Sequence, residues 1–312
     1  MNRKTGPPEF GNQDCPICKN VRGLSEHLVE LGQAAEFLGN QSPYTSEHGS
    51  VQIRTETIGE WLQLASKLEK VQVDAWKFGD EGASYCETIA DSLNEHSKHY
   101  SDHATALTRF IFVCNGLEET YRFIDHLYVP LANKKGLAPG SRKRTSSLRA
   151  IALLDDLFDR SGSAVLPREF DHLAGNFVKL FRNYTARHKA AISGMDVDAQ
   201  TRRTHALHLV RNLRNHVSHG TFPIGPPTDY GGYEDNEELV QLLNHGCRIA
   251  AIYIQVALHA FCEGFESYEY NAMLDANGSE FEAFVKGCTL EYVRDLHLRG
   301  KFALHKGLYG GT

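Results

Sequence analysis

Long apolar runs are missing from this sequence of 312 residues. A helix that crosses a bilayer needs about 20 consecutive, mostly apolar residues, and no such stretch occurs. The segment from Met1 to Asn12 is polar and contains glycine and proline, so it lacks the apolar centre of a signal peptide. Both absences predict a protein without a membrane span, for which a cytoplasmic location is the default expectation.

An excess of positive charge is missing too. The formal net charge is −6 at pH 7, so the surface as a whole does not attract nucleic acid, and any RNA contact must come from local basic patches. Cysteines are few and odd in number: 7 are present, and most of them lie dispersed in apolar helical patterns, where Cys acts as a small hydrophobe. A disulfide framework is therefore not expected.

Strand-like alternation is rare, and the best candidate, Ser50 to Thr55, is short. Apolar residues with helical spacing dominate elsewhere, so the sequence predicts an all-α protein. We expect a module with helices at 1–100, a helical bundle at 101–266 and a helical tail at 267–312, and a loop from Gly39 to Ser50. The expected helices are Ser25 to Leu38, Ile58 to Phe78, Ala83 to Ser97, Asp102 to Tyr128, Leu148 to Phe158, Arg168 to Ile192, Ala199 to Ser218 and Asn236 to Gly264.

The segment from Leu213 to Gly220 reads Leu-Arg-Asn-His-Val-Ser-His-Gly and holds two overlapping arginine–histidine pairs. Arg214 is followed by Asn215 and, five positions on, by His219, whereas Arg211 is followed in the same way by His216.

Helix geometry helps to choose between the two pairs. An advance of about 100° per residue puts Arg214 and His216 on the two shoulders of the apolar stripe, and Arg211 nearly opposite it, facing solvent. Catalytic residues should lie at the rim of a packed face, which favours Arg214. Gly220 is suited to end the helix in the left-handed conformation, so that His219 can turn toward Arg214. His216 and Arg211 stay as accessory candidates.

The pattern Arg214-Asn215-x-x-x-His219 resembles the signature of the HEPN superfamily. These proteins are helical-bundle ribonucleases of toxin–antitoxin, anti-phage and RNA-guided immune systems. The order of elements is similar as well: a motif near the end of a helix, then a loop (Thr221 to Asp235), then a long apolar helix. The resemblance implies a HEPN-like helical bundle preceded by a mostly helical N-terminal extension.

The resemblance also implies a metal-independent endoribonuclease. RNA carries its own nucleophile, the ribose 2′-hydroxyl. His219 would then transfer a proton, Arg214 would stabilise charge on the phosphate, and Asn215 would orient either group. Two alternatives remain. Arg and His also complement the dipole at the end of any helix, and a HEPN-like chain can be a non-catalytic RNA- or nucleotide-binding subunit of a defence complex.

Partners follow from the same resemblance. HEPN active sites usually form where two such domains meet, so a homodimer with both motifs at its interface is expected. An antitoxin or a partner ATPase is the expected regulator. An acidic residue on the helix that opens the bundle often supports the site, and Glu118, next to Leu117 of the apolar stripe, is the better candidate than Glu119.

A basic loop from Lys134 to Arg149 contains no acidic residue and can hold phosphates, or simply be solvated. The candidate RNA-binding residues in it are Lys134, Lys135, Arg142, Lys143 and Arg144.

Cys15-Pro16-Ile17-Cys18 has the spacing of half a zinc knuckle, because two thiolates three positions apart can share one tetrahedral ion. The sequence thus offers a structural zinc ion, and no cofactor is expected for catalysis. An inert pair near a terminus is the equal alternative. The missing ligands could be His27, the cysteines of a partner chain, or the histidines of a polar, solvated helix end (His96, His99 and His103).

Overall fold

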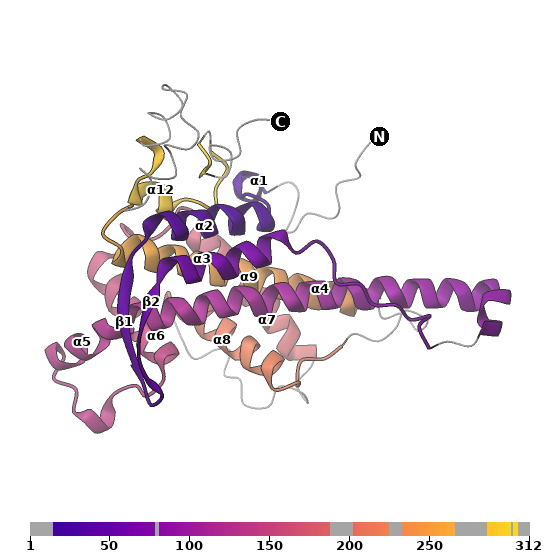
Figure 1. Cartoon of the computed structure of the whole chain (residues 1–312), viewed down its shortest axis with the longest axis horizontal. Helices are drawn as coiled ribbons and strands as arrows, with labels where there is room; N and C mark the ends of the chain where they lie inside the picture. Colours follow the sequence, from indigo (N-terminus) through magenta and orange to yellow (C-terminus); the bar gives the residue numbers. More distant parts are fainter. Residues whose placement is uncertain are drawn as a thin grey trace.

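The computed structural model describes residues 15–78, 81–187, 202–224, 233–265, 286–300 and 302–304. In these ranges the chain is mostly helical, as predicted, with one two-stranded sheet (Figure 1). No helix described here is long and apolar enough to cross a membrane. The α-helices are α1 (Pro16–Asn20), α2 (Leu24–Leu38), α3 (Thr55–Lys67), α4 (Glu87–Ile124), α5 (Tyr128–Lys134), α6 (Ser146–Ser161), α7 (Phe170–Arg187), α8 (His205–Ser218), α9 (Tyr233–Phe261) and α12 (Leu290–Arg294).

Helices α4 and α9 run together through the middle of the molecule. In Figure 1, α2 and α3 lie on one side of them and α8 on the other. A single apolar cluster joins these layers, with Leu28 of α2, Phe110 of α4, Leu213 of α8 and Ile252 of α9 all fully buried. The N-terminal helices therefore pack directly on the bundle and share its core.

Two glycines allow α2 and α3 to approach closely. A Cβ atom on Gly59 would lie only 2.6 Å from the carbonyl oxygen of Gly32, and one on Gly32 would lie 3.1 Å from the carbonyl oxygen of Gly59. Real Cβ atoms do not tolerate the shorter distance. Glycine at both positions is thus what brings the two backbones into contact.

A β-hairpin precedes α3. Its second strand, β2 (Gly49–Arg54), confirms the predicted strand within one residue, and pairs antiparallel with β1 (Gln41–Ser46). The expectation of a loop from Gly39 to Ser50 is therefore wrong. Pro43 lies opposite Gln52 in this ladder, which is permitted because both strands of a two-stranded sheet are edges.

Helix α4 is the main departure from the expected helices. It is continuous over 38 residues, where the sequence predicted one helix ending at Ser97 and another starting at Asp102. His99 and His103 are buried within it, with 5% and 4% exposure, so the reading of this stretch as a solvated helix end is wrong. The helix also crosses the expected boundary between residues 100 and 101.

Hydrogen bonds from the extended segment Val71–Ala75 explain why α4 stays helical between Ser97 and Asp102, where the sequence predicted a break. The predicted helix from Ile58 to Phe78 ends at Lys67 as α3, and the chain then runs back along α4. The backbone N–H groups of Val71, Val73 and Ala75 donate to the hydroxyls of Thr105, Ser101 and Ser97, at 2.9, 2.9 and 3.0 Å.

The spacing of these bonds is matched. Two residues of an extended chain span about 6.6 Å, and four residues of a helix span about 6.0 Å. Every second N–H of the segment therefore meets every fourth residue of α4. We call this set of three bonds the hydroxyl ladder.

A chain of buried side-chain hydrogen bonds links distant parts of the sequence. His27 of α2 bonds Gln255 Oε1 of α9 at 2.9 Å through Nε2, and Gln255 Nε2 bonds His297 Nδ1 at 3.1 Å. His297 Nε2 in turn donates to the carbonyl of Arg168 at 2.8 Å. Burial lowers the pKa of both histidines, so both rings are neutral near pH 7. We call this chain of hydrogen bonds the His27–His297 relay.

Helices α6, α7, α8 and α9 follow the predictions closely, whereas α1 and α5 were not predicted. Helix α6 contains the predicted Leu148 to Phe158, and α9 begins three residues before the expected Asn236 and ends three before Gly264. The predicted helices at Arg168 to Ile192 and Ala199 to Ser218 are present as α7 and α8, and their parts at 188–201 lie outside the described residues. In the expected helical tail, α12 is a short helix as predicted.

Candidate functional site

The end of α8 has the predicted glycine cap. Gly220 has a φ of 67°, in the left-handed region. The Thr221 N–H donates to the His216 carbonyl at 2.9 Å, and the Gly220 N–H donates to the Val217 carbonyl at 3.1 Å. These two bonds form a Schellman motif, which satisfies carbonyls at the end of a helix. The cap fixes where the motif helix stops and leaves His219 at its exposed edge.

Arg214 lies at the rim of the contact between α8 and α4, as the helix geometry predicted. Its neighbour Leu213 is fully buried, which anchors this turn. The Nη2 atom of Arg214 is 3.8 Å from Oε1 of Glu118, with the two side chains 40% and 24% exposed. Arg214 Nη1 is also 3.5 Å from Oδ1 of Asn215. The structure thus brings Arg214, Asn215 and Glu118 together at one accessible point.

The two histidines of the motif occupy the next turn. His216 is half-buried and its Nδ1 is 3.0 Å from the hydroxyl of Thr221. Burial lowers the pKa of His216, and the nearby His219 lowers it further. Among the described residues, no hydrogen bond joins His219 to Arg214, so the expected turn of His219 toward Arg214 is not seen as a contact.

The helix geometry predicted that Arg211 faces solvent, but the structure places it against α6. Its Nε donates to the hydroxyl of Ser147 on α6 at 3.1 Å, and the side chain is half-buried. The prediction failed because it considered α8 alone, whereas α6 covers part of the face opposite the core. The arginines of the two arginine–histidine pairs therefore make different contacts: Arg211 binds α6, and Arg214 faces Glu118 on α4.

Tyr121 was not found by sequence reasoning, because a tyrosine in an apolar stripe looks like ordinary core. It lies one turn after Glu118 on α4 and is 2% exposed. In the described part of the chain its hydroxyl has no hydrogen-bond partner. Burial raises the pKa of Tyr121 well above its usual value, and the charge of Glu118 adds to this. The carboxylate of Glu118 thus lies beside a buried, apolar part of α4.

The basic loop is partly structured, and its charges are partly neutralised. Lys135 pairs with Asp156 of α6 at 2.8 Å, and Arg142 donates to Oδ1 of Asn133 at 2.6 Å. Lys134, Lys143 and Arg144 form no ion pair within the described residues. The loop itself has no acid, but the neighbouring helix α6 supplies one, which sequence reasoning on the loop alone did not detect.

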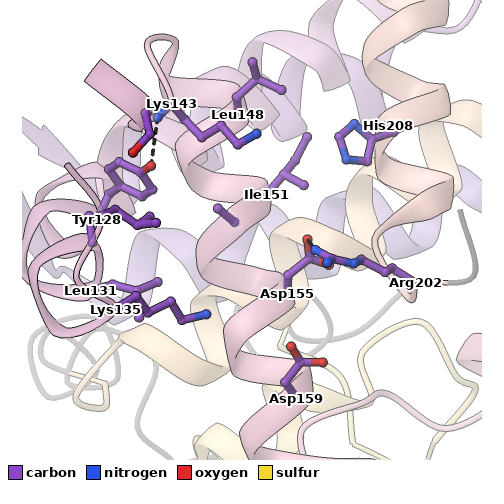
Figure 2. Close-up of a pocket in the computed structure, with 14 residues that line it drawn as sticks. Tyr128, Leu131, Lys135, Lys143, Leu148, Ile151, Asp155, Asp159, Arg202 and His208 are labelled. Carbon is purple, nitrogen blue, oxygen red and sulfur yellow. Dashed lines mark hydrogen bonds and ion pairs between the residues drawn. The ribbon is translucent and has the colours of Figure 1, made fainter. Parts of the chain in front are cut away.

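A cavity of about 680 Å³ lies between this loop, α6 and the first half of α8. Figure 2 shows Lys143 on the loop side and His208 on the α8 side, with Ile151 and Asp155 of α6 between them. Asp155 pairs with Arg202 at 3.0 Å. Burial lowers the pKa of His208. The cavity has mixed charge and connects the basic loop to the motif helix.

A second group of functional side chains lies at the start of the described chain. The ligand atoms of Cys15, Cys18 and His172 all lie within 4.8 Å of one another, an arrangement that could bind a metal ion. The sulfurs of Cys15 and Cys18 are 3.6 and 3.5 Å from His172 Nε2. A backbone hydrogen bond from Cys18 lowers the pKa of Cys15. Burial raises the pKa of Cys18 to about 11.

The histidines expected to complete this cluster lie elsewhere. His27 belongs to the His27–His297 relay, and the run from His96 to His103 lies on α4. The actual neighbour, His172, was missed because it is 157 residues from Cys15. No local spacing rule can connect side chains so far apart in the sequence.

Two features just before α7 hold His172 in place. Glu169, just before α7, has a φ of 63°, which is rare for a residue other than glycine. Arg168 is fixed on both sides of its backbone, since its N–H donates to Asp295 at 3.0 Å and its carbonyl accepts from His297 at 2.8 Å. Together these contacts set the point where α7 begins and hence the direction of His172.

Comparisons with models of known protein families, with curated proteins and with solved structures give no significant match to this chain.

Proposed function

We propose that the chain is a metal-independent endoribonuclease of HEPN type that acts in toxin–antitoxin or anti-phage defence. The observation that carries this proposal is the position of Arg214, held near Glu118 at an exposed helix end that also presents Asn215, His216 and His219. The host-defence role rests on the resemblance of the motif.

The chemistry assigns one role to each group. His219 removes the proton of the ribose 2′-hydroxyl or delivers a proton to the leaving oxygen. Arg214 binds the phosphate and offsets the negative charge that develops on it. Asn215 orients the phosphate, and His216 assists as an accessory group. The products are a 2′,3′-cyclic phosphate and a 5′-hydroxyl, and no metal ion takes part.

One face of α8 offers a path for the RNA strand. At about 100° per residue, His208, Asn215 and His219 fall within roughly 40° of one another. None of the three is buried. This face begins at the cavity beside Lys143 and ends at the motif, about 16 Å away along the helix. Exposed Lys134, Lys143 and Arg144 would hold phosphates outside the cleavage point.

The complete site forms between two copies of the chain. One chain supplies a single motif, and the active protein is a cytoplasmic homodimer with the two motifs facing each other. An antitoxin or a partner ATPase controls it. The ion that Cys15 and Cys18 hold is a structural zinc, because cleavage through the 2′-hydroxyl needs no metal.

A cleavage assay on purified protein tests this function. Wild type should cut mixed RNA in the presence of a chelator, and should leave DNA and 2′-O-methylated RNA intact. His219→Ala should lose at least a hundredfold in rate. His48→Ala is the matched control, because His48 is exposed on the hairpin and pairs with the adjacent Glu47. Absence of cutting by wild type and by both variants would contradict an enzymatic role.

The choice between the two arginine–histidine pairs is tested separately. Arg214→Ala should abolish cutting while the free energy of unfolding changes little, since this side chain lies at the rim. Arg211→Ala removes the bond to Ser147 and should lower stability by about 1 kcal/mol, with cutting retained. The reverse outcome would assign the site to Arg211 and His216.

A second candidate function is a non-catalytic subunit that binds RNA or a nucleotide within a defence complex. The cavity lined by Lys143 and His208 favours it. In that case wild type and His219→Ala bind RNA equally and neither cuts it, whereas Lys143→Glu weakens binding.

A further inference from the structure

One ring nitrogen of His172 has more polar neighbours than it can bind. Its Nε2 lies 3.6 Å from the sulfur of Cys15, 3.5 Å from that of Cys18 and 3.1 Å from Nδ2 of Asn176. A neutral imidazole nitrogen carries either one hydrogen or one lone pair. A cation between the two sulfurs and the nitrogen would use all three ligand atoms at once.

The distances between the ligand atoms fit a zinc ion. Zinc binds sulfur at about 2.3 Å and imidazole nitrogen at about 2.0–2.1 Å in tetrahedral geometry, which places sulfur and nitrogen about 3.6 Å apart. The two distances observed here are 3.6 and 3.5 Å. Calcium and magnesium prefer oxygen ligands, whereas two thiolates and an imidazole suit zinc.

We infer that Cys15, Cys18 and His172 form a zinc site with three protein ligands, whose fourth position opens into the adjoining cavity. Within the described residues, no fourth His, Cys, Asp or Glu joins this group. The cavity has a volume of about 340 Å³, and Asn176, Gln241 and His245 line it. Solvent or a small anion takes the fourth position. The inference is independent of the proposed ribonuclease.

The ion fastens the start of the described chain to the bundle. Helix α1 is five residues long and none of its residues is buried, so apolar packing contributes little to its position. Cys15, just before α1, and Cys18 within it approach His172 of α7, which lies 154 residues beyond Cys18. In Figure 1, α1 and α8 lie on opposite sides of the molecule, which separates this centre from the proposed cleavage site.

Metal analysis of the full-length protein tests the site. Wild type purified with zinc in the medium should contain about one zinc per chain. Cys18→Ser and His172→Ala should each lower this at least tenfold. Cys86→Ser, which changes an exposed cysteine outside the cluster, should keep it. A wild type without zinc, with iron in its place, or with a disulfide between Cys15 and Cys18 would overturn the inference.

Cobalt substitution tests the open position and needs no variant. Cobalt-loaded wild type should show the absorption of a tetrahedral thiolate site, and added azide should change that spectrum. An unchanged spectrum would mean that the site is closed. His245→Ala should keep its zinc, and a tenfold loss would make His245 the fourth ligand and overturn the open position. None of these measurements depends on RNA cleavage.

Discussion

The guanidinium of Arg214 and the carboxylate of Glu118 face each other across the contact between α8 and α4, with 3.8 Å between Nη2 and Oε1. This separation lies within the range of an ion pair but is longer than a direct hydrogen bond. Glu118 therefore attracts the guanidinium without binding its donors. Apart from Nη1, which is 3.5 Å from Oδ1 of Asn215, Arg214 can keep its donors for a second anion, such as a phosphate.

Glu118→Gln keeps the shape of the side chain and removes its charge. Because Glu118 positions Arg214 in the proposed site, kcat for RNA cleavage should fall about tenfold, or ~1.4 kcal/mol in activation free energy, with little change in KM. The free energy of unfolding should stay constant, which would separate a positioning role from a structural one. Steady-state kinetics and urea unfolding provide the two readouts.

Glu119→Gln is the matched control for this experiment. Glu119 is adjacent in sequence but pairs with Arg122 at 2.5 Å, away from Arg214. Its cleavage rate should equal that of wild type. Equal losses in both glutamate variants would show that the charge of Glu118 plays no specific role.

A complementation experiment tests the dimeric site. Arg214→Ala and His219→Ala are each inactive in the proposed mechanism. Co-expressed with different tags and purified as mixed dimers, they should regain part of the cleavage activity, because the arginine of one chain meets the histidine of the other. Mixed dimers that form and stay inactive would place the whole site within one chain.

Stability should decrease in acid. Burial lowers the pKa of His297 to about 4, from its usual 6.5, so below pH 6.5 the unfolded chain binds a proton that the folded protein does not. The contribution of neutral His297 to the free energy of unfolding is complete above pH 6.5. It is lost as the pH falls toward 4, by up to roughly 3 kcal/mol.

Urea unfolding at a series of pH values measures this loss. His297→Gln can still donate to the Arg168 carbonyl and should show a shallower pH dependence than wild type. His48→Gln, on the exposed hairpin, should match wild type. Parallel curves for all three proteins would mean that His297 is not the group responsible.

Alanine should have opposite effects on stability at two helical glycines, Gly59 in the contact between α2 and α3 and Gly175 on α7. Gly59→Ala should destabilise the protein by about 1–3 kcal/mol, because its Cβ would clash with the Gly32 carbonyl. Gly175→Ala, on α7, meets no atom within 4 Å and should stabilise by up to about 1 kcal/mol through helix propensity. Thermal unfolding of both variants measures the two changes in stability. If Gly59→Ala left the stability unchanged, α2 and α3 would be free to move apart.

Features with a local cause were predictable from the sequence. Gly220 ends α8 because only glycine adopts the left-handed conformation at little cost, and this rule needs no knowledge of the rest of the fold. The position of Arg214 followed from helix periodicity and the apolar stripe. The HEPN resemblance suggested an acidic residue on this helix, its register next to Leu117 favoured Glu118, and Glu118 does lie near Arg214.

Features that depend on another element were not predictable. Arg211 was expected in solvent because α6, with Ser147, was not part of the helical projection. The polar stretch around His99 looked like a helix end because hydroxyls and histidines there are usually solvated. His172 could not be assigned to the cysteines, since the fold alone brings them together.

The hydroxyl ladder gives the segment beside α4 an unusual signature in solution. Val71, Val73 and Ala75 donate their N–H groups to α4, while the intervening residues alternate with them along an extended chain. Slow and fast amide hydrogen exchange should therefore alternate with a period of two, as at the edge of a sheet, although the partner is a helix. Ser101→Ala would turn the central slow amide into a fast one, so a single oxygen atom on α4 sets the local opening rate of a neighbouring strand-like segment.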